Sequence, residues 1–173
     1  QTKAGIIKEK SVVVSSAQWE SVEEIIRARA KQEYHFAGQS FELLGAQPEG
    51  YGTRFSVRGI VGNYPDLWMP MIGEHQAENA ATAIAAVEMF LGGRAVADEV
   101  LRSALADSLS PGRLQVVSKQ PLIVLDGAHN PAGLRSLNRS IKWHFKPERT
   151  VALVAMLADK DIDSAAAVLA ETF

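Results

Sequence analysis

One segment of this sequence, residues 122–131, constrains the fold more than any other. It opens with apolar residues that are typical of a strand inside a parallel sheet, and the acid Asp126 follows them directly. After a Gly-Ala-His turn, Asn130 and Pro131 form the pattern of a helix N-cap and its first helical position. The segment therefore predicts a strand that turns at once into a helix, the unit from which α/β folds are built.

The end of this predicted strand is also a candidate ligand site. Ligands of open α/β sheets bind at the carboxyl ends of the strands. Asp126 and His129 occupy that place, where a ribose hydroxyl or a phosphate can be bound. The alternative is a capped turn with both side chains in solvent, and the spacing alone favours neither.

The residues around this segment extend the α/β pattern. Apolar runs predict further strands at 114–117 and 150–156, and helical spacing predicts helices at 132–145 and 161–173. The order β, α, β, α implies parallel pairing through a right-handed crossover.

A domain boundary is predicted at the Leu-Ser-Pro-Gly sequence of residues 109–112. Pro and Gly together disfavour helix and strand at the point where the pattern changes. About 60 residues follow, which is marginal for an independent α/β core. We therefore expect one domain in residues 1–109 and an incomplete second domain in residues 110–173.

The first of these domains mixes strands and helices. Residues 11–15 predict a strand and residues 17–31 an amphipathic helix. Between residues 34 and 71, alternation broken by Gly and Pro predicts two or three antiparallel strands. Helical spacing returns at 77–91, ends at a Gly-Gly pair, and recurs at 96–105.

Composition excludes several classes of function. Eighteen Lys and Arg against 20 Asp and Glu give a net charge of −2 without a basic block, so nucleic acid is not an expected partner. No apolar run reaches the roughly 18 residues of a membrane span, and no signal peptide is present, so no membrane partner is expected. The absence of cysteine excludes disulfides, thiolate metal sites and a Cys nucleophile, which suits a reducing cytoplasm.

Polar residues at other element ends are further candidates. At the start of a predicted helix, His75 lies one turn from Asn79, and Gln76 lies three positions from it, so their polar ends can converge. The two amides can meet the edge of a base there. Helix capping and surface polarity are the alternative. Arg113 follows the predicted linker and offers a planar fork of donors to phosphate oxygens, unless it is an ordinary surface arginine.

Three weaker candidates remain. Lys3 precedes a small, apolar stretch, where a desolvated amine becomes nucleophilic, even toward carbon dioxide; by composition alone it is a Lys near a chain end. Residues 159–161, Asp-Lys-Asp, either orient a substrate or form a charged loop that caps the last helix. His35 and His144 have no partner at metal-ligand spacing, so no zinc site is expected.

Five short motifs, taken together, resemble a known family. They are Lys-Ala-Gly-Ile-Ile-Lys at 3–8, Gly-Glu-His-Gln-x-x-Asn-Ala at 73–80, Ser-Pro-Gly-Arg at 110–113, Asp-Gly-Ala-His-Asn-Pro at 126–131 and Asp-Lys-Asp at 159–161. Their order and spacing resemble the bifunctional folylpolyglutamate synthase and dihydrofolate synthase family, which is related to the Mur ligases of cell-wall synthesis. The resemblance covers essentially the whole chain.

The resemblance implies a fold and a position within a longer protein. It implies the end of a Mur-ligase-type ATPase domain in residues 1–109, followed by the first half of a Rossmann-like C-terminal ligase domain. Family members carry an upstream Gly-rich phosphate loop, the P-loop, with metal-binding acidic and His residues, and they continue well beyond Phe173. None of these features is in this sequence, so we expect the fragment alone to be inactive. Thr2 departs from the Glu that the family usually has there.

ATP-dependent amide formation is the reaction that the resemblance implies. ATP phosphorylates a carboxylate of dihydropteroate or of a folate glutamate, and the amine of L-glutamate attacks the acyl phosphate. By position, Gln76 and Asn79 would contact adenine and Asp126 the ribose. Arg113 would bind the triphosphate, and His129 the phosphate or the acyl phosphate.

The resemblance also implies a metal ion. Lys3 matches the lysine that the family carbamylates, which converts a cation into a carboxylate-like ligand for Mg²⁺. Lys3, His129 and Arg113 are then the implied catalytic residues, with ATP and Mg²⁺ as cofactors. The implied partners are small molecules only, namely folate or dihydropteroate, L-glutamate and ATP, and we expect the full-length protein to be a cytoplasmic monomer.

Two other functions stay open. A Mur-type ligase that adds an amino acid to a peptidoglycan precursor shares the Asn, Arg and Asp pattern, although the Ala-His-Asn-Pro and His-Gln forms favour the folate branch. The second open function is a non-catalytic α/β interaction module, and the absence of a phosphate loop from this sequence favours it. A missing upstream segment explains that absence more simply.

Overall fold

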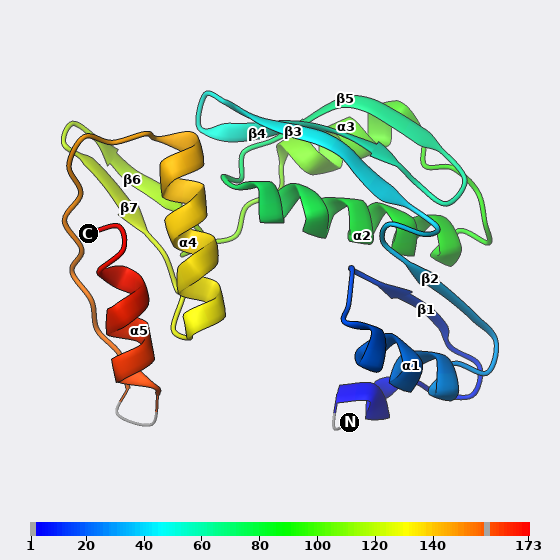
Figure 1. The fold of residues 1–173 in the computed structure, drawn as a ribbon. Helices are drawn as coiled ribbons and strands as arrows, with labels where there is room; N and C mark the ends of the chain where they lie inside the picture. The colour runs from blue at the N-terminus through cyan, green and yellow to red at the C-terminus, as the bar shows by residue number, and fades with distance from the viewer. Residues whose placement is uncertain (1–2, 158–159) are drawn as a thin grey trace.

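The computed structural model describes residues 3–157 and 160–173. It shows the mixed α/β structure that the sequence predicts, with residues 115–173 standing beside an N-terminal part (Figure 1). No helix in the part of the chain described is long and apolar enough to cross a membrane.

The N-terminal part begins with a small β-α-β unit. Its elements are η1 (Lys3–Ile6), β1 (Val12–Ser15), α1 (Glu20–Arg29) and β2 (Glu33–Phe36). β1 and β2 pair in parallel, because α1 returns the chain to the starting edge between them. The predicted helix 17–31 is shorter at both ends, and Trp19 before it is 83% exposed.

An antiparallel sheet and two helices complete this part. They are β3 (Glu42–Glu49), β4 (Gly52–Arg58), β5 (Asn63–Met69), α2 (Glu74–Phe90) and α3 (Asp98–Ala106). β4 alternates as predicted: Phe55 and Val57 are buried, while Arg54 and Arg58 form ion pairs on the open face. α2 covers the buried face through its alanines and Ile84, and α3 packs beside β5 (Figure 1).

One buried carboxylate, Glu88 of α2, ties this helix to the sheet. Its side chain is fully buried. It accepts hydrogen bonds from the N–H groups of Ile60 at 2.6 Å and Gly62 at 2.7 Å, and from the Tyr64 hydroxyl at 2.8 Å. The Val61 N–H adds a longer bond of 3.2 Å. Glu88 therefore satisfies the donors of the β4–β5 turn where water is excluded.

We predict that Glu88→Gln lowers the free energy of unfolding by about 3 kcal/mol, because the amide replaces an acceptor oxygen with a donor that faces backbone donors. Chemical denaturation measures this difference. Glu78→Gln, at an exposed position of the same helix, should change stability by less than about 0.5 kcal/mol. Equal stability of the two variants would contradict the role of Glu88.

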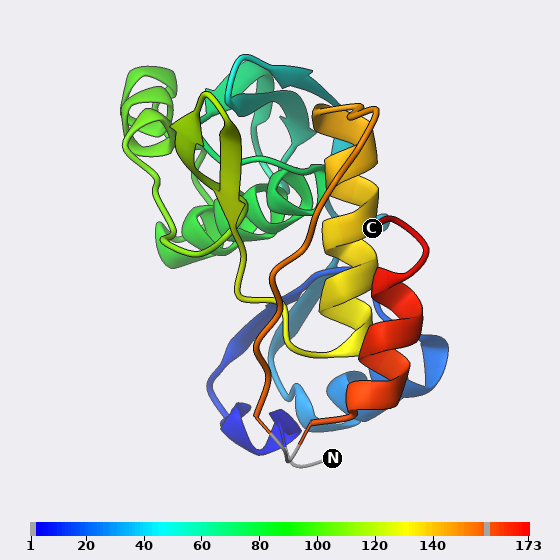
Figure 2. The same cartoon turned by 90° about the vertical axis from the view of Figure 1, so that its left-hand side faces the viewer.

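The C-terminal part contains β6 (Gln115–Lys119), β7 (Leu122–Leu125), α4 (Pro131–His144) and α5 (Ile162–Leu169). β6 and β7 pair as an antiparallel hairpin. α4 and α5 lie side by side (Figure 2) and share a small core of Leu134, Ala165 and Val168. The buried Asn138 adds a hydrogen bond from its Nδ2 to the Val168 carbonyl at 2.6 Å.

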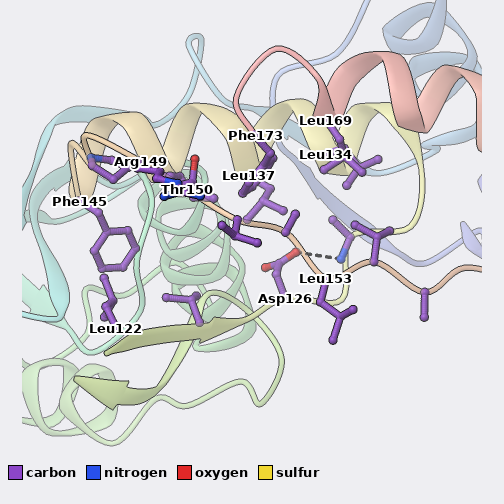
Figure 3. Close-up of a pocket in the computed structure, with 18 residues that line it drawn as sticks. Leu122, Asp126, Leu134, Leu137, Phe145, Arg149, Thr150, Leu153, Leu169 and Phe173 are labelled. Atoms are coloured by element: carbon purple, nitrogen blue, oxygen red, sulfur yellow. Dashed lines mark hydrogen bonds between the residues drawn. The ribbon is translucent and has the colours of Figure 1, made fainter. Parts of the chain in front are cut away.

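The predicted strand at 150–156, and with it the parallel crossover after β7, is wrong. Val151 and Leu153 of this apolar segment are largely exposed. A cavity of about 590 Å³ lies between the segment and β7, and both Leu122 and Leu153 line it (Figure 3). The described residues form no ladder hydrogen bonds between the two segments, so this apolar run has no neighbouring strand among them.

The two parts of the chain meet along α4. Ile72, just before α2, packs with Leu114 and Ile141 in one buried cluster. At the end of α4, His144 donates its Nε2–H to the Gly50 carbonyl in the β3–β4 turn at 2.9 Å. These contacts hold α4 against the N-terminal part and create the junction at which the candidate site lies.

Candidate functional site

A cleft of about 430 Å³ lies at this junction. Its walls come from segments far apart in the sequence: the start of α2, which supplies His75, the linker before β6, the turn after β7 and the first turns of α4. Arg113, Asp126 and His129 all line it. Concave sites with a few convergent polar groups are the usual form of a small-molecule site.

Asp126 shapes the cleft through backbone contacts. Its Oδ2 accepts the Leu114 N–H at 2.9 Å, and its Oδ1 accepts the Ala128 N–H at 2.8 Å. Leu114 has a φ of 47°, a left-handed conformation that residues with a Cβ rarely adopt. The Gly127 N–H also donates to the Gly112 carbonyl at 2.7 Å. The linker is therefore fastened to the end of β7.

Arg113 stands between two left-handed residues, Gly112 with φ 72° and Leu114 with φ 47°. It lines the cleft, and its guanidinium has no hydrogen-bond or ion-pair partner among residues 3–157 and 160–173. Its planar fork is thus available to donate to the oxygens of a bound phosphate.

His129 and the start of α4 line the cleft next to Asp126. His129 donates its Nδ1–H to the Gly127 carbonyl at 2.9 Å, which leaves Nε2 for a ligand. Asn130 caps α4, since its Oδ1 accepts the Gly133 N–H at 2.9 Å, and a proline follows at the first helical position. The predicted cap is confirmed, and it brings the positive end of a helix to the cleft.

The amides of Gln76 and Asn79 lie beside the cleft rather than in its wall. Asn79 Nδ2 donates to Gln76 Oε1 at 3.3 Å, and Gln76 Nε2 lies 3.0 Å from His75 Nε2. His75 lines the cleft and therefore joins the amide pair to it. The sequence places His75 beside these amides but gives it no role at the ligand, because its second partner, Ser140, is 65 positions away.

Two predicted features are not among the described residues that line the cleft. Lys3 begins η1, which packs against α1, and its side chain lies outside what the structure describes. Asp159 also lies outside the described residues. Asp161 caps α5, as one sequence alternative had it: hydrogen bonds from Ser164, including one to its Oδ1 at 3.1 Å, lower the pKa of its carboxyl.

Comparison with known proteins identifies the family. Residues 112–173 match the model described as Mur ligase, glutamate ligase domain. Over 99% of its length the chain is 34% identical to a dihydrofolate synthase/folylpolyglutamate synthase of Mycobacterium tuberculosis. The chain belongs to the folylpolyglutamate synthase and dihydrofolate synthase family. It covers 38% of that relative's length.

Solved structures of this family have the same fold. A Mycobacterium tuberculosis folylpolyglutamate synthase complexed with ADP matches with a TM-score of 0.93 at 34% identity, over 99% of this chain and 40% of that one. A folylpolyglutamate synthase complex with AMPPCP and folate gives a TM-score of 0.87 at 32% identity, over 99% and 43%. The α/β fold and the resemblance seen in the motifs are therefore confirmed.

The Mg²⁺ ion implied for a member of this synthase family does not fit the described residues alone. Nowhere in residues 3–157 and 160–173 do three or more Asp, Glu or His side chains converge as metal ligands. A metal would need ligands beyond those described.

The larger cavity beside β7 is lined differently from the cleft. Its walls are mostly aliphatic side chains from β7, α4 and residues 149–155, and Asp126 stands at its edge with a hydrogen bond to the backbone (Figure 3). Few donors or acceptors converge there. The smaller cleft is therefore the better candidate for a polar ligand.

Two histidines at the junction are held neutral. Burial lowers the pKa of His75; the charge of Asp126 opposes this effect, and the charges of Arg113 and Arg139 add to it. Burial likewise lowers the pKa of His144. Protonation of either ring therefore disfavours the docked arrangement of α4.

We predict that the melting temperature falls as the pH is lowered through about 6.5, the pKa of an unfolded-state histidine. The pKa values of these histidines are lower in the folded state, so the unfolded protein takes up protons first as the pH falls. The stability that is present above pH ~6.5 is therefore lost progressively as the pH falls toward the folded-state pKa values. Calorimetry between about pH 8 and pH 5 measures this loss. His144→Gln should reduce this dependence of the melting temperature on pH. A constant melting temperature across this range would contradict the assignment.

Proposed function

We propose that this chain is part of an ATP-dependent amide ligase, which joins L-glutamate to folate, to dihydropteroate or to both through an acyl phosphate. One observation supports this most directly: Arg113, Asp126 and His129 share a single cleft in a chain of the synthase family. Solved relatives are complexes with ADP and with AMPPCP and folate, which are ligands of the kind that such a reaction uses.

In the proposed reaction, ATP transfers its γ-phosphoryl group to a substrate carboxylate and leaves as ADP. The amine of L-glutamate then attacks the acyl carbon, an amide bond forms and phosphate departs. The barrier lies in neutralising charge on the transferred group and in aligning the amine. Fixed hydrogen-bond donors around the phosphates are therefore the main requirement.

The nucleoside contacts are assigned to three residues. Gln76 and Asn79 present amide donors and acceptors to adenine. Asp126 contacts the ribose: each carboxylate oxygen accepts one backbone N–H and keeps a further lone pair for a hydroxyl donor. The same carboxylate thus shapes the linker and binds the ligand.

The phosphate contacts are assigned to Arg113 and His129. The Arg113 fork, which has no partner among the described residues, donates to the triphosphate oxygens. His129 presents Nε2 to the phosphate or the acyl phosphate, because its Nδ1 is engaged with a carbonyl. The N-terminus of α4 adds a favourable field for anions at the same place.

We also propose the division of the chain into the end of an ATP-binding domain, residues 1–109, and the start of a ligase domain, residues 110–173. Two observations support it. The cores are separate, with Phe55 and Val57 in one and Leu134 and Val168 in another. The match to the glutamate ligase domain begins within the linker, at residue 112.

In a protein of the relatives' full length, we predict that Arg113→Ala lowers kcat at least about 100-fold, because a donor to phosphoryl oxygens acts mainly in the transition state. Its melting temperature should stay the same, since the guanidinium has no partner in the described structure. ADP release in steady state and thermal unfolding are measured together.

The matched control for this prediction is Arg94→Ala. Arg94 donates to the Leu91 carbonyl at the far end of α2, so its removal should leave kcat unchanged. An Arg113→Ala variant with normal turnover, or one whose loss of turnover follows from unfolding, would remove Arg113 from the site.

Residues 1–173 alone should show no folate-dependent or glutamate-dependent ATP hydrolysis. This sequence contains no Gly-rich P-loop to hold the β and γ phosphates, and one arginine cannot replace its N–H groups and lysine. The measurement is turnover with ATP, Mg²⁺, a folate and L-glutamate, beside calorimetric titration with ATP. Turnover on the order of 1 per second would show that the phosphate-binding groups lie within these residues.

A further inference from the structure

A chain of four hydrogen-bonded side chains crosses the junction from α4 to α2. On the α4 side, Ser140 Oγ lies 3.3 Å from His75 Nδ1, although the two residues are 65 positions apart in the sequence. On the α2 side, His75 Nε2 lies 3.0 Å from Gln76 Nε2. Asn79 Nδ2 completes the chain, 3.3 Å from Gln76 Oε1.

The chemistry of these groups determines which one donates and which one accepts each hydrogen bond. Gln76 Oε1 accepts from Asn79, so its Nε2 faces His75, and an amide nitrogen can only donate. His75 Nε2 is therefore the acceptor, and the ring proton lies on Nδ1, which donates to Ser140 Oγ. Each group thereby determines the orientation of the next.

Asn79, the last side chain in this series of hydrogen bonds, is suited to one type of base. Asn79 is exposed, and one of its amide hydrogens points to Gln76. Its Oδ1 and its second N–H remain, an acceptor beside a donor. This pair complements the N6 amino group and N7 of adenine, and it does not complement a 6-oxo purine, which has two acceptors there.

We propose that His75 and Ser140 are positioning residues that orient the Gln76 and Asn79 amides for adenine, and that they do so only while α4 is docked against α2. The inference rests on the proposed adenine contact of these amides. It adds that selection of the base depends on the contact between the N-terminal and C-terminal parts of the protein.

The packing around His75 supports this role. Gln76 and Ser140 are both buried, so water does not replace a lost partner. Gly73 has a φ of 115°, and a Cβ there would lie 2.6 Å from the His75 ring and 2.7 Å from Ser140 Oγ. Only glycine therefore permits this close approach between the start of α2 and α4.

The surroundings of His75 favour the neutral ring that the hydrogen-bond chain needs, chiefly through burial. A protonated ring would place an N–H against the Gln76 amide hydrogens and break the chain at its centre. Burial lowers the pKa of His75 and keeps it neutral. Charged groups face it from all elements packed around it, namely Asp126, Arg113 and Arg139, with Glu74, Glu78 and Lys142 around the adjoining cavity.

The test compares ATP with inosine triphosphate, which carries a 6-oxo purine, in a protein of the relatives' full length. Ser140→Ala should raise KM for ATP about 3- to 10-fold, the equivalent of one lost hydrogen bond, and leave KM for inosine triphosphate, KM for L-glutamate and kcat unchanged. Ser103→Ala, the same change at an exposed position of α3, is the matched control and should match the unsubstituted protein.

A second variant tests the same role at His75, so that the conclusion does not depend on whether Ser140→Ala folds normally. His75→Gln retains an acceptor for Gln76 Nε2 but cannot also reach Ser140, so it should reproduce the loss of ATP preference. Because both residues act in one chain, the double variant should be no worse than His75→Gln alone. Thermal unfolding of each variant accompanies the kinetics.

The outcomes separate this inference from the proposed function. If ligation proceeds and both variants keep the original preference for ATP, the positioning role is overturned and the function stands. If the unsubstituted protein does not ligate glutamate, the proposed function fails, and calorimetric binding of ATP against inosine triphosphate still decides the positioning role. Equal affinity for the two nucleotides, or affinity for neither, overturns it.

Discussion

The two backbone hydrogen bonds of the Asp126 carboxylate are the interaction on which the rest of the cleft depends. One oxygen holds Leu114 in a left-handed conformation, and the other holds the turn that leads into α4. Together they place Arg113 and His129 in the same concavity. A carboxylate at the end of a strand thus does structural work before any ligand is bound, and its remaining lone pairs are in position for one.

The junction above this cleft is small and partly polar. One apolar cluster, built around Ile72 and Ile141, is supplemented by the contacts of His75 and His144 with groups in the other part of the chain. Junctions of this kind allow relative motion of the parts they join. When the groups that bind a ligand are hydrogen-bonded across such a junction, their orientation depends on whether α4 is docked against α2. Packing of the two parts then affects which ligand is selected.

Elements with local signals could be predicted. The alternation of β4, the Gly-Gly stop after α2 and the Asn130-Pro131 start of α4 each depend on residues within a few positions of one another. The run at 150–156 has an equally clear apolar pattern, yet it forms no strand, because a strand needs a partner at ladder distance. The Glu88 carboxylate was not predicted either, since its donors lie 24 to 28 positions away.

By itself, the sequence determined which polar side chains stand at the ends of elements: Arg113 after the linker, Asp126 after a strand and His129 before a helix. It also determined the family, because the order of the short motifs can be read from the sequence alone. Only the tertiary structure decided that these residues share a cleft with His75, and that Ser140 is its partner 65 positions away. The physical reason is that backbone propensities act over a few residues, whereas hydrogen-bond partners across a junction depend on how whole elements pack.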